Sequence, residues 1–185
     1  MIRDPDEPQL DFERLLDVVH YICSKCDPSE LGNVKLHKIL YFSDMLHFAK
    51  TGRPLTGVEY QKQKYGPCAR HLTKAVLELR EQGRLKIEKR DFYGFKKMDY
   101  VAIGEPRLNR LANDNITTLV DLVIDFVCQR TAKEISELSH SSPWEAAEMG
   151  EKIPYYTAFW LQLPELTEYD VIEAENRLQE LPEFA

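Results

Sequence analysis

Two groups of residues combine nucleophilic or metal-binding side chains at close spacing. The first contains His20, Cys23 and Cys26, with the Cys-x-x-Cys spacing found in zinc and thiol redox sites. The second contains Cys68 and His71, which are three residues apart and can share one face of a helix. A structural zinc site needs four ligands, and no second clustered pair follows. We therefore expect Cys23 and Cys26 to pack as small hydrophobic residues.

The pair Cys68 and His71 lacks the other parts of a nucleophilic active site. Cysteine catalysis also needs a group that orients the histidine and donors that stabilise an oxyanion, and the sequence identifies neither. There is no phosphate-binding glycine loop, and the acidic residues after position 98 lack the spacing of a calcium loop. We predict a protein that is not an enzyme, with no catalytic residues, no cofactor and no bound metal.

The net charge of −7 is spread unevenly along the chain. Residues 57–97 carry 11 basic and 5 acidic groups, whereas residues 98–185 carry 6 basic and 17 acidic groups. A basic segment in an acidic protein favours an acidic protein partner or the chain's own acidic end. It is less basic than the domains that bind nucleic acid.

The hydrophobic periodicity predicts the elements that position these residues. Helices are expected at 10–26 and 34–49, a strand at 57–64, a third helix from Pro67 to Gly83, and a hairpin from 84–90 and 97–103. Helices follow from about residue 106, and two capping boxes are expected, Thr131 with Glu134 and Ser142 with Glu145. The predicted fold is α+β: a mainly α-helical single domain with one small three-stranded antiparallel sheet.

The order of these elements in the N-terminal half is similar to that of a winged-helix DNA-binding domain, which gives an alternative function as a transcriptional regulator. Basic side chains would then face DNA phosphates: Lys74, Arg80, Arg84, Lys86, Lys89, Arg90, Lys96 and Lys97. The overall acidity makes DNA binding the less favoured interpretation.

The 185 residues can bury one good core, and 43% of them are hydrophobic. No apolar run approaches the roughly 20 residues of a membrane helix. The first residues are acidic and contain proline, unlike a secretory signal, so we expect a cytoplasmic location and no membrane partner. We also expect Cys23, Cys26 and Cys128 to be buried free thiols.

Three sequence blocks, taken together, resemble a known family. They are Lys35-Leu36-His-Lys38-Ile-Leu-Tyr41-Phe42, then Gly52-Arg-Pro54 followed by Lys64-Tyr65-Gly66-Pro67, and finally Ser139-His140 followed by Pro143-Trp144. Their order and spacing are similar to those of the Panacea domain of SocA-like antitoxins from bacteria and phages.

The resemblance implies a non-enzymatic protein that neutralises a toxin, encoded by a neighbouring gene, through direct contact. Some members resemble adaptors that deliver the toxin to a protease, so a protease is an alternative partner. The signature residues themselves fit a scaffold role: Lys35, Leu36, Lys38, Tyr41, Phe42, Gly52, Pro54, Gly66, Pro67, Ser139, His140, Pro143 and Trp144. Within it, we expect Trp144 to fill the junction between the last helices and the core.

Gly66 and Pro67 predict a rigid turn that presents polar and aromatic side chains. We expect the partner to contact exposed residues around this turn and along a strand with a free edge: Tyr60, Lys62, Lys64, Tyr65, Arg70 and His71.

The last 22 residues, 164–185, form a separate unit in this interpretation, after a domain spanning 1–163. They carry seven acidic groups and one basic group. Their apolar residues follow a narrow helical seam, so we expect an acidic helix that docks near the basic segment 57–97 or competes with the partner for it.

Overall fold

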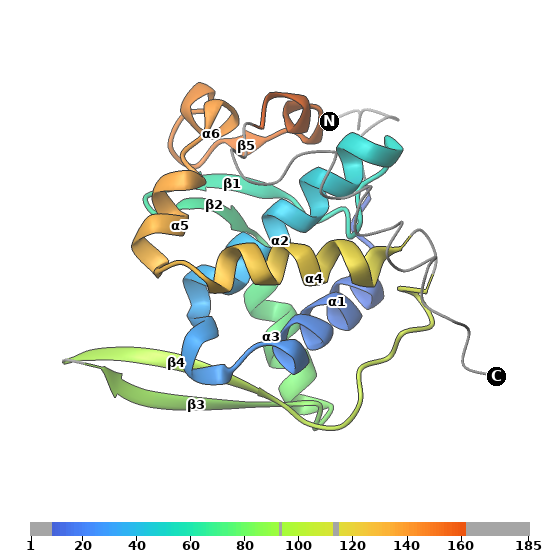
Figure 1. The fold of residues 1–185 in the computed structure, drawn as a ribbon, viewed down its shortest axis with the longest axis vertical. Coiled ribbons are helices and arrows are strands. Elements are labelled where there is room, and N and C mark those ends of the chain that lie inside the picture. Colours follow the sequence, from blue (N-terminus) through green and yellow to red (C-terminus); the bar gives the residue numbers. More distant parts are fainter. Residues whose placement is uncertain (1–8, 93, 113–114, 162–185) are drawn as a thin grey trace.

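The computed structural model describes residues 9–92, 94–112 and 115–161. Helix α2 (Pro28–Thr51) is central, and helix α4 (Ile116–Cys128) crosses it (Figure 1). Helices α1 (Phe12–Lys25) and α3 (Leu72–Glu81) lie on one side, and a small sheet lies on the other with α5 (Ala132–Leu138) and α6 (Ser142–Ala146). A long hairpin of β3 (Leu85–Phe92) and β4 (Phe95–Ala102) projects from the body. The α+β class with a mainly helical character is therefore confirmed. In the described residues, no helix is both long enough and apolar enough to cross a membrane.

Helices α1 (Phe12–Lys25) and α2 (Pro28–Thr51) confirm the first two predicted helices. The Asp11 side chain caps α1 by accepting a hydrogen bond from the Arg14 amide at 2.9 Å. Asp27 caps α2, and Pro28 occupies its first turn. Gly32, with a φ of 57°, kinks α2 near its start. After the kink, every residue from 35 to 45 is buried, as expected for a helix covered on all sides.

The first sheet has the order β2-β1-β5, all antiparallel, from β1 (Tyr60–Gln63), β2 (Gly66–Ala69) and β5 (Lys152–Ile153). Two predictions are wrong here. Pro67 lies in β2 and begins no helix, because β2 is an edge strand, which tolerates a residue without an amide hydrogen. Helix α3 (Leu72–Glu81) begins later, and Gly83 follows it with a φ of 70°. The expected free edge on the strand at 57–64 is absent, because β1 pairs on both sides.

Strands β3 (Leu85–Phe92) and β4 (Phe95–Ala102) pair only with each other in the described residues. The predicted hairpin is confirmed, but the single three-stranded sheet is replaced by two separate sheets. The strand expected to pair with the hairpin, β1, already has β2 and β5 as neighbours, so no edge of β1 remains for it. The start of α2 lies between the two hairpins (Figure 1).

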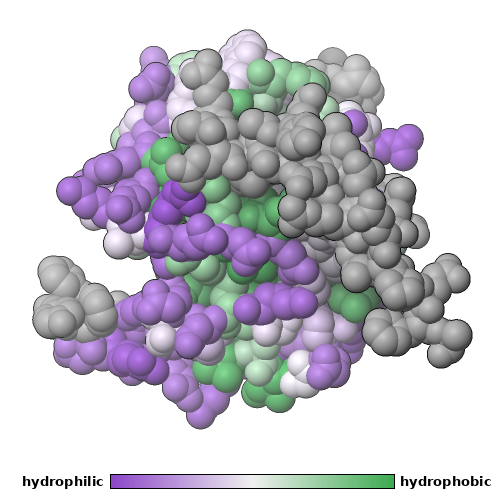
Figure 2. Space-filling view, in the orientation of Figure 1, coloured by the Kyte–Doolittle hydropathy of each residue, from purple (hydrophilic) through white to green (hydrophobic). Residues whose placement is uncertain are grey.

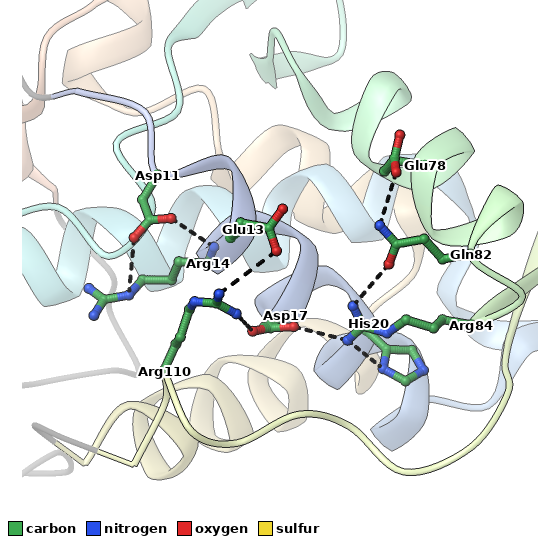
Figure 3. A network of polar contacts seen from close by, with 9 residues as sticks. All are labelled: Asp11, Glu13, Arg14, Asp17, His20, Glu78, Gln82, Arg84 and Arg110. Atoms are coloured by element: carbon green, nitrogen blue, oxygen red, sulfur yellow. Dashed lines mark hydrogen bonds and ion pairs between the residues drawn. The ribbon is translucent and has the colours of Figure 1, made fainter.

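A buried ionic network fixes the base of the β3–β4 hairpin to α1 (Figure 3). Arg84, just before β3, donates to Asp17 at 2.9 Å, and Arg110 donates to the other oxygen of the same carboxylate at 2.9 Å. Asp17 is buried, as is Arg84. His20 lies 3.3 Å from Arg84, and burial followed by the Arg84 charge lowers the pKa of His20. Asp17 thereby joins α1 to two segments that follow it by about 70 and 90 residues in the sequence.

The C-terminal part consists of α4 (Ile116–Cys128), α5 (Ala132–Leu138), α6 (Ser142–Ala146) and the 3₁₀ helix η1 (Tyr155–Trp160). The capping box of Thr131 and Glu134 is confirmed by both of its hydrogen bonds. The second predicted box is wrong, because Ser141 takes the cap position and Ser142 is already helical. The predicted acidic helix and the domain boundary at 163/164 lie outside the described residues.

Candidate functional site

The turn between β1 and β2 projects from the sheet and exposes two side chains. Lys64 and Tyr65 form a two-residue hairpin loop, because Gln63 pairs with Gly66. Tyr65 is 61% exposed, although its carbonyl accepts a hydrogen bond from the Ser136 hydroxyl at 2.9 Å. Helix α5 therefore supports the backbone of this turn while the aromatic ring faces solvent.

A second aromatic unit lies beside the turn. The rings of His140 and Trp144 stack with their centroids 3.9 Å apart. The Trp144 indole donates to the Gln63 carbonyl at 3.1 Å, and the Lys62 ammonium lies 4.0 Å from the centre of the indole ring. Lys62 also donates to the Ala147 carbonyl at 2.9 Å. Trp144 is thus half-buried, packs against the hydrophobic core and joins α6 to the hairpin, in agreement with the expected junction.

Tyr60, predicted to be exposed, is fully buried. Its hydroxyl donates to Asp44 at 2.7 Å, and the Thr56 hydroxyl and amide donate to the same carboxylate. Burial, followed by the Asp44 charge, raises the pKa of Tyr60. Because β1 lies between two strands, its inward residue faces α2, so Tyr60 helps to position the hairpin and is removed from the binding surface.

The predicted binding residues Arg70 and His71 lie at the far end of the hairpin from the turn. Arg70 follows β2 and pairs with Glu59 at 3.1 Å. His71 precedes α3 as its cap residue without a side-chain capping bond. At about 3.3 Å per strand residue, four residues separate them from Lys64 and Tyr65 by more than 10 Å. The structure therefore brings Lys62, Lys64 and Tyr65 together with His140 and Trp144, and leaves Arg70 and His71 outside this group.

A small pocket of about 120 Å³ opens between α2 and the β1–β2 hairpin. It is lined by residues from the two elements: Asn33, Val34, His37, Lys38, Gln63, Tyr65, Gly66, Pro67 and Cys68. Tyr65 belongs both to this pocket and to the exposed turn. We call the turn, the His140–Trp144 pair and the pocket together the hairpin-tip site.

Lys38 is the charged group of this pocket. Its side chain is only 2% exposed, and its ammonium donates to the Pro67 carbonyl at 2.9 Å. Burial lowers the pKa of Lys38 to about 7. Gly66, with a φ of 95°, has no side chain where one would collide: a Cβ there would lie 2.2 Å from the Ser139 hydroxyl and 2.7 Å from the Lys38 nitrogen. The glycine therefore makes room for the ammonium.

The histidine beside Cys68 is His37, which lies in α2, and not the nearby His71 of the sequence pair. His37 Nε2 lies 3.7 Å from the Cys68 sulfur, and His37 Nδ1 accepts a hydrogen bond from the Ala69 amide at 3.1 Å. In neutral imidazole, acceptance at Nδ1 places the proton on Nε2, which then cannot take the thiol proton. Burial lowers the pKa of His37 to about 4 and raises the pKa of Cys68. This geometry does not activate a thiolate.

The remaining signature residues lie in or near the core. Leu36, Tyr41 and Phe42 are fully buried. Ser139, at the end of α5, and Pro143, in α6, are also buried. Gly52 ends α2 with a φ of 70°, and Pro54 follows it, half-buried. Lys35 is buried and pairs with Glu30 at 3.8 Å.

The cysteines are free, and Cys23 and Cys26 are buried as predicted, whereas Cys128 is only half-buried. The sulfurs of Cys26 and Cys128 lie 3.8 Å apart, joining the ends of α1 and α4. Within the described ranges, no group of three His, Cys, Asp or Glu side chains is arranged to hold a metal ion.

Sequence reasoning missed His37 and Asn33 as pocket residues and placed Lys38 in the scaffold. The available signal was the run Lys35-Leu-His-Lys38, which puts cationic groups into a helix that is predicted to be buried on most sides. Charged side chains are rarely fully buried without a partner, so a lysine in such a helix is itself a marker of a site.

Comparison with known families gives one match. A family model described as "Antitoxin SocA-like, Panacea domain" matches residues 36–145, which is more than half of the chain. This range begins in α2 and ends in α6, so it contains every element of the hairpin-tip site except the first residues of the pocket. No curated protein and no solved structure matches the chain significantly.

Proposed function

Because the chain belongs to the SocA-like antitoxin family with a Panacea domain, we propose that it neutralises a protein toxin by binding it directly through the hairpin-tip site. The toxin is expected to be encoded by a neighbouring gene. The observation that carries this proposal is that two signature blocks meet at one exposed surface. Trp144 of the last block, together with the neighbouring Ser136, holds the turn on which Tyr65 of the second block is exposed.

The chemistry of this surface supports binding by protein–protein contact. Tyrosine and tryptophan are the side chains most often found at the energetic centres of interfaces. Both are held rigidly here, since the Tyr65 backbone and the Trp144 indole are hydrogen-bonded. A rigid surface loses little conformational entropy when it binds.

We also propose that the protein acts without catalysis. The pocket contains a cysteine and a histidine, but their hydrogen bonds leave the thiol without a base. Binding alone is then sufficient to account for the features of the site. Delivery of the bound toxin to a protease would use the same contact and remains the alternative outcome of binding.

The DNA-regulator alternative is less well supported, because at least three of the eight cations that it requires form ion pairs within the chain. Arg84 is buried against Asp17, Lys86 pairs with Glu88 at 2.7 Å, and Arg90 pairs with Asp99 at 2.9 Å. Phosphate binding at these positions would have to break those pairs.

The proposal is tested by co-expression with the product of the neighbouring gene. We expect growth arrest by that product alone and rescue when this protein is present. Tyr65→Ala should abolish rescue, because it removes the most exposed aromatic ring of the site, while Tyr156→Ala, which removes an exposed tyrosine on η1, should preserve it. If the wild-type protein gives no rescue and does not bind the toxin in a pull-down, the proposed function is wrong.

A further inference from the structure

The described part of the chain contains three buried cations, and their surroundings differ. Arg84 is paired with Asp17 at 2.9 Å and Lys35 with Glu30 at 3.8 Å. Lys38 is the most deeply buried of the three, and among the described residues no carboxylate lies within ion-pair distance of it. Its hydrogen bond goes to the neutral carbonyl of Pro67. A buried charge normally has a counter-charge. The described part of the chain supplies none to the Lys38 ammonium.

The pocket around Lys38 offers hydrogen-bond donors and no negative charge. None of its nine lining residues is acidic. The Tyr100 hydroxyl donates to the Asn33 side-chain oxygen at 3.1 Å, which leaves the Asn33 amide hydrogens for a ligand. His37 carries its proton on the nitrogen that faces Cys68. Such a set of donors around an ammonium is complementary to an anion.

The dimensions of the pocket restrict what kind of anion can enter. A volume of about 120 Å³ is well below the 300–1,000 Å³ of sites for cofactors and other small molecules. It holds roughly four water molecules at about 30 Å³ each, or one short acidic side chain. The exposed Tyr65 forms part of the rim, so a side chain that enters the pocket comes from a body that also covers Tyr65.

The surface outside the pocket is suited to such a body. The start of α2 lies between the β1–β2 turn and the projecting β3–β4 hairpin (Figure 1). Figure 2 shows the molecule hollowed on the side where this hairpin projects, with hydrophilic residues on much of the visible edge. Residues 57–97, which include the β1–β2 hairpin, β3 and the start of β4, carry the excess of basic groups in the chain. A partner with an acidic surface is therefore favoured here.

We propose that the Lys38 pocket receives an aspartate or glutamate side chain of the protein partner, with Lys38 as its counter-ion and Tyr65 covered at the rim. The inference builds on the proposed function, because it specifies how the toxin is held. Truncating one member of a buried charge pair at an interface lowers affinity strongly, so loss of the Lys38 charge should weaken toxin binding by at least about tenfold.

The first arm of the test uses small probes and needs no toxin. The amide resonances of Gly66 and Cys68 are followed by NMR during titration with N-acetylaspartate amide, and with N-acetylasparagine amide as the neutral control. We expect saturable shifts with the charged probe alone, and their loss in Lys38→Met. Equal shifts with both probes, or shifts that persist in Lys38→Met, would show that the pocket does not recognise a carboxylate.

The second arm measures toxin affinity by calorimetry for wild type, Lys38→Met and Lys35→Met. Lys35→Met is the matched control, because it removes a buried cation of the same helix that already has its carboxylate. We expect the tenfold loss only for Lys38→Met. Full affinity of Lys38→Met for the toxin would overturn the inference and leave the proposed function intact. Absence of toxin binding by the wild type would instead contradict the proposed function, and the probe titration would still decide whether the pocket binds carboxylates.

Discussion

The buried position of Lys38 makes the stability of the free protein depend on pH. This contribution can be measured separately by comparing the wild type with a variant that lacks the Lys38 charge. The folded protein holds the pKa of Lys38 at about 7, against 10.5 for an ordinary lysine, because burial disfavours the charged ammonium. Between these two values the unfolded chain binds more protons at this residue than the folded chain does. The free energy of unfolding must therefore rise with pH across this interval.

The size of the effect follows from the same two values. A full difference of one bound proton gives a slope of about 1.4 kcal/mol per pH unit. Below about pH 7 the ammonium is charged in both states and the contribution of Lys38 is constant, and it reaches its maximum near pH 10. Water entering the open pocket reduces the penalty, so we expect a total gain of about 2–3 kcal/mol between pH 7 and 10.

Urea unfolding of wild type and Lys38→Met at pH 6, 7, 8 and 9 measures this contribution. Other groups titrate in the same range, so the informative quantity is the difference between the two free energies of unfolding. We expect it to be flat from pH 6 to 7 and then to change in favour of the wild type. Lys133→Met, at an exposed position of α5, should run parallel to the wild type. Parallel curves for Lys38→Met would show that the buried ammonium is not destabilised and would refute the reasoning.

Three further predictions concern stability and thiol chemistry. Gly66→Ala should lower the free energy of unfolding by about 2–4 kcal/mol in chemical denaturation, because the new Cβ would collide with Ser139 and Lys38 at a φ of 95°. Gly94→Ala is the control: nothing lies within 4 Å of its Cβ, so it should lower the free energy of unfolding by less. Asp17→Asn should lower the free energy of unfolding by about 3 kcal/mol in the same assay, since it leaves the buried Arg84 without its carboxylate. The surface change Glu137→Gln should lower it by less than about 0.5 kcal/mol, and an equally small loss for Asp17→Asn would contradict the prediction. Diamide should join Cys26 to Cys128, whose sulfurs are 3.8 Å apart, because the hydrogen bond between the two thiols and then the nearby Lys35 lower the pKa of Cys128. Peptide mapping that finds Cys23 or Cys68 in the disulfide instead would contradict this geometry.

The helices could be predicted from the sequence because their signals are local. The residues that form the apolar stripe of α1 are close together in the sequence, and so are Thr131 and Glu134 of the capping box. The strand pairing could not, because it depends on contacts between distant segments. Nothing near Tyr60 reveals that Ile153 lies beside it, and this pairing is what removes the free edge and turns the tyrosine inward.

The site was predictable only where exposure follows from the turn itself. Gly66 and Pro67 indicated a turn at this place in the sequence, and the structure has a two-residue turn just before them, with Lys64 and Tyr65 exposed. The start of α3 was misplaced, because a proline after a glycine fits the first turn of a helix and an edge strand equally well. The shape of the pocket could not be predicted, since it arises where α2 and the hairpin meet; only the cationic run from Lys35 to Lys38 indicated that a site was near.

The pairing of β5 with β1 also determines when the hairpin-tip site can form during synthesis. The Lys62 amide donates to the Glu151 carbonyl, and the Gly150 amide donates back to Lys62. The sheet that carries the turn is therefore incomplete until the ribosome has passed residue 153, although the turn itself is made by residue 66. At 5–20 residues per second, this delay is on the order of ten seconds. A chain that stops before residue 153 thus lacks the pairing of β5 with β1 behind the turn, and we expect it not to bind the proposed toxin.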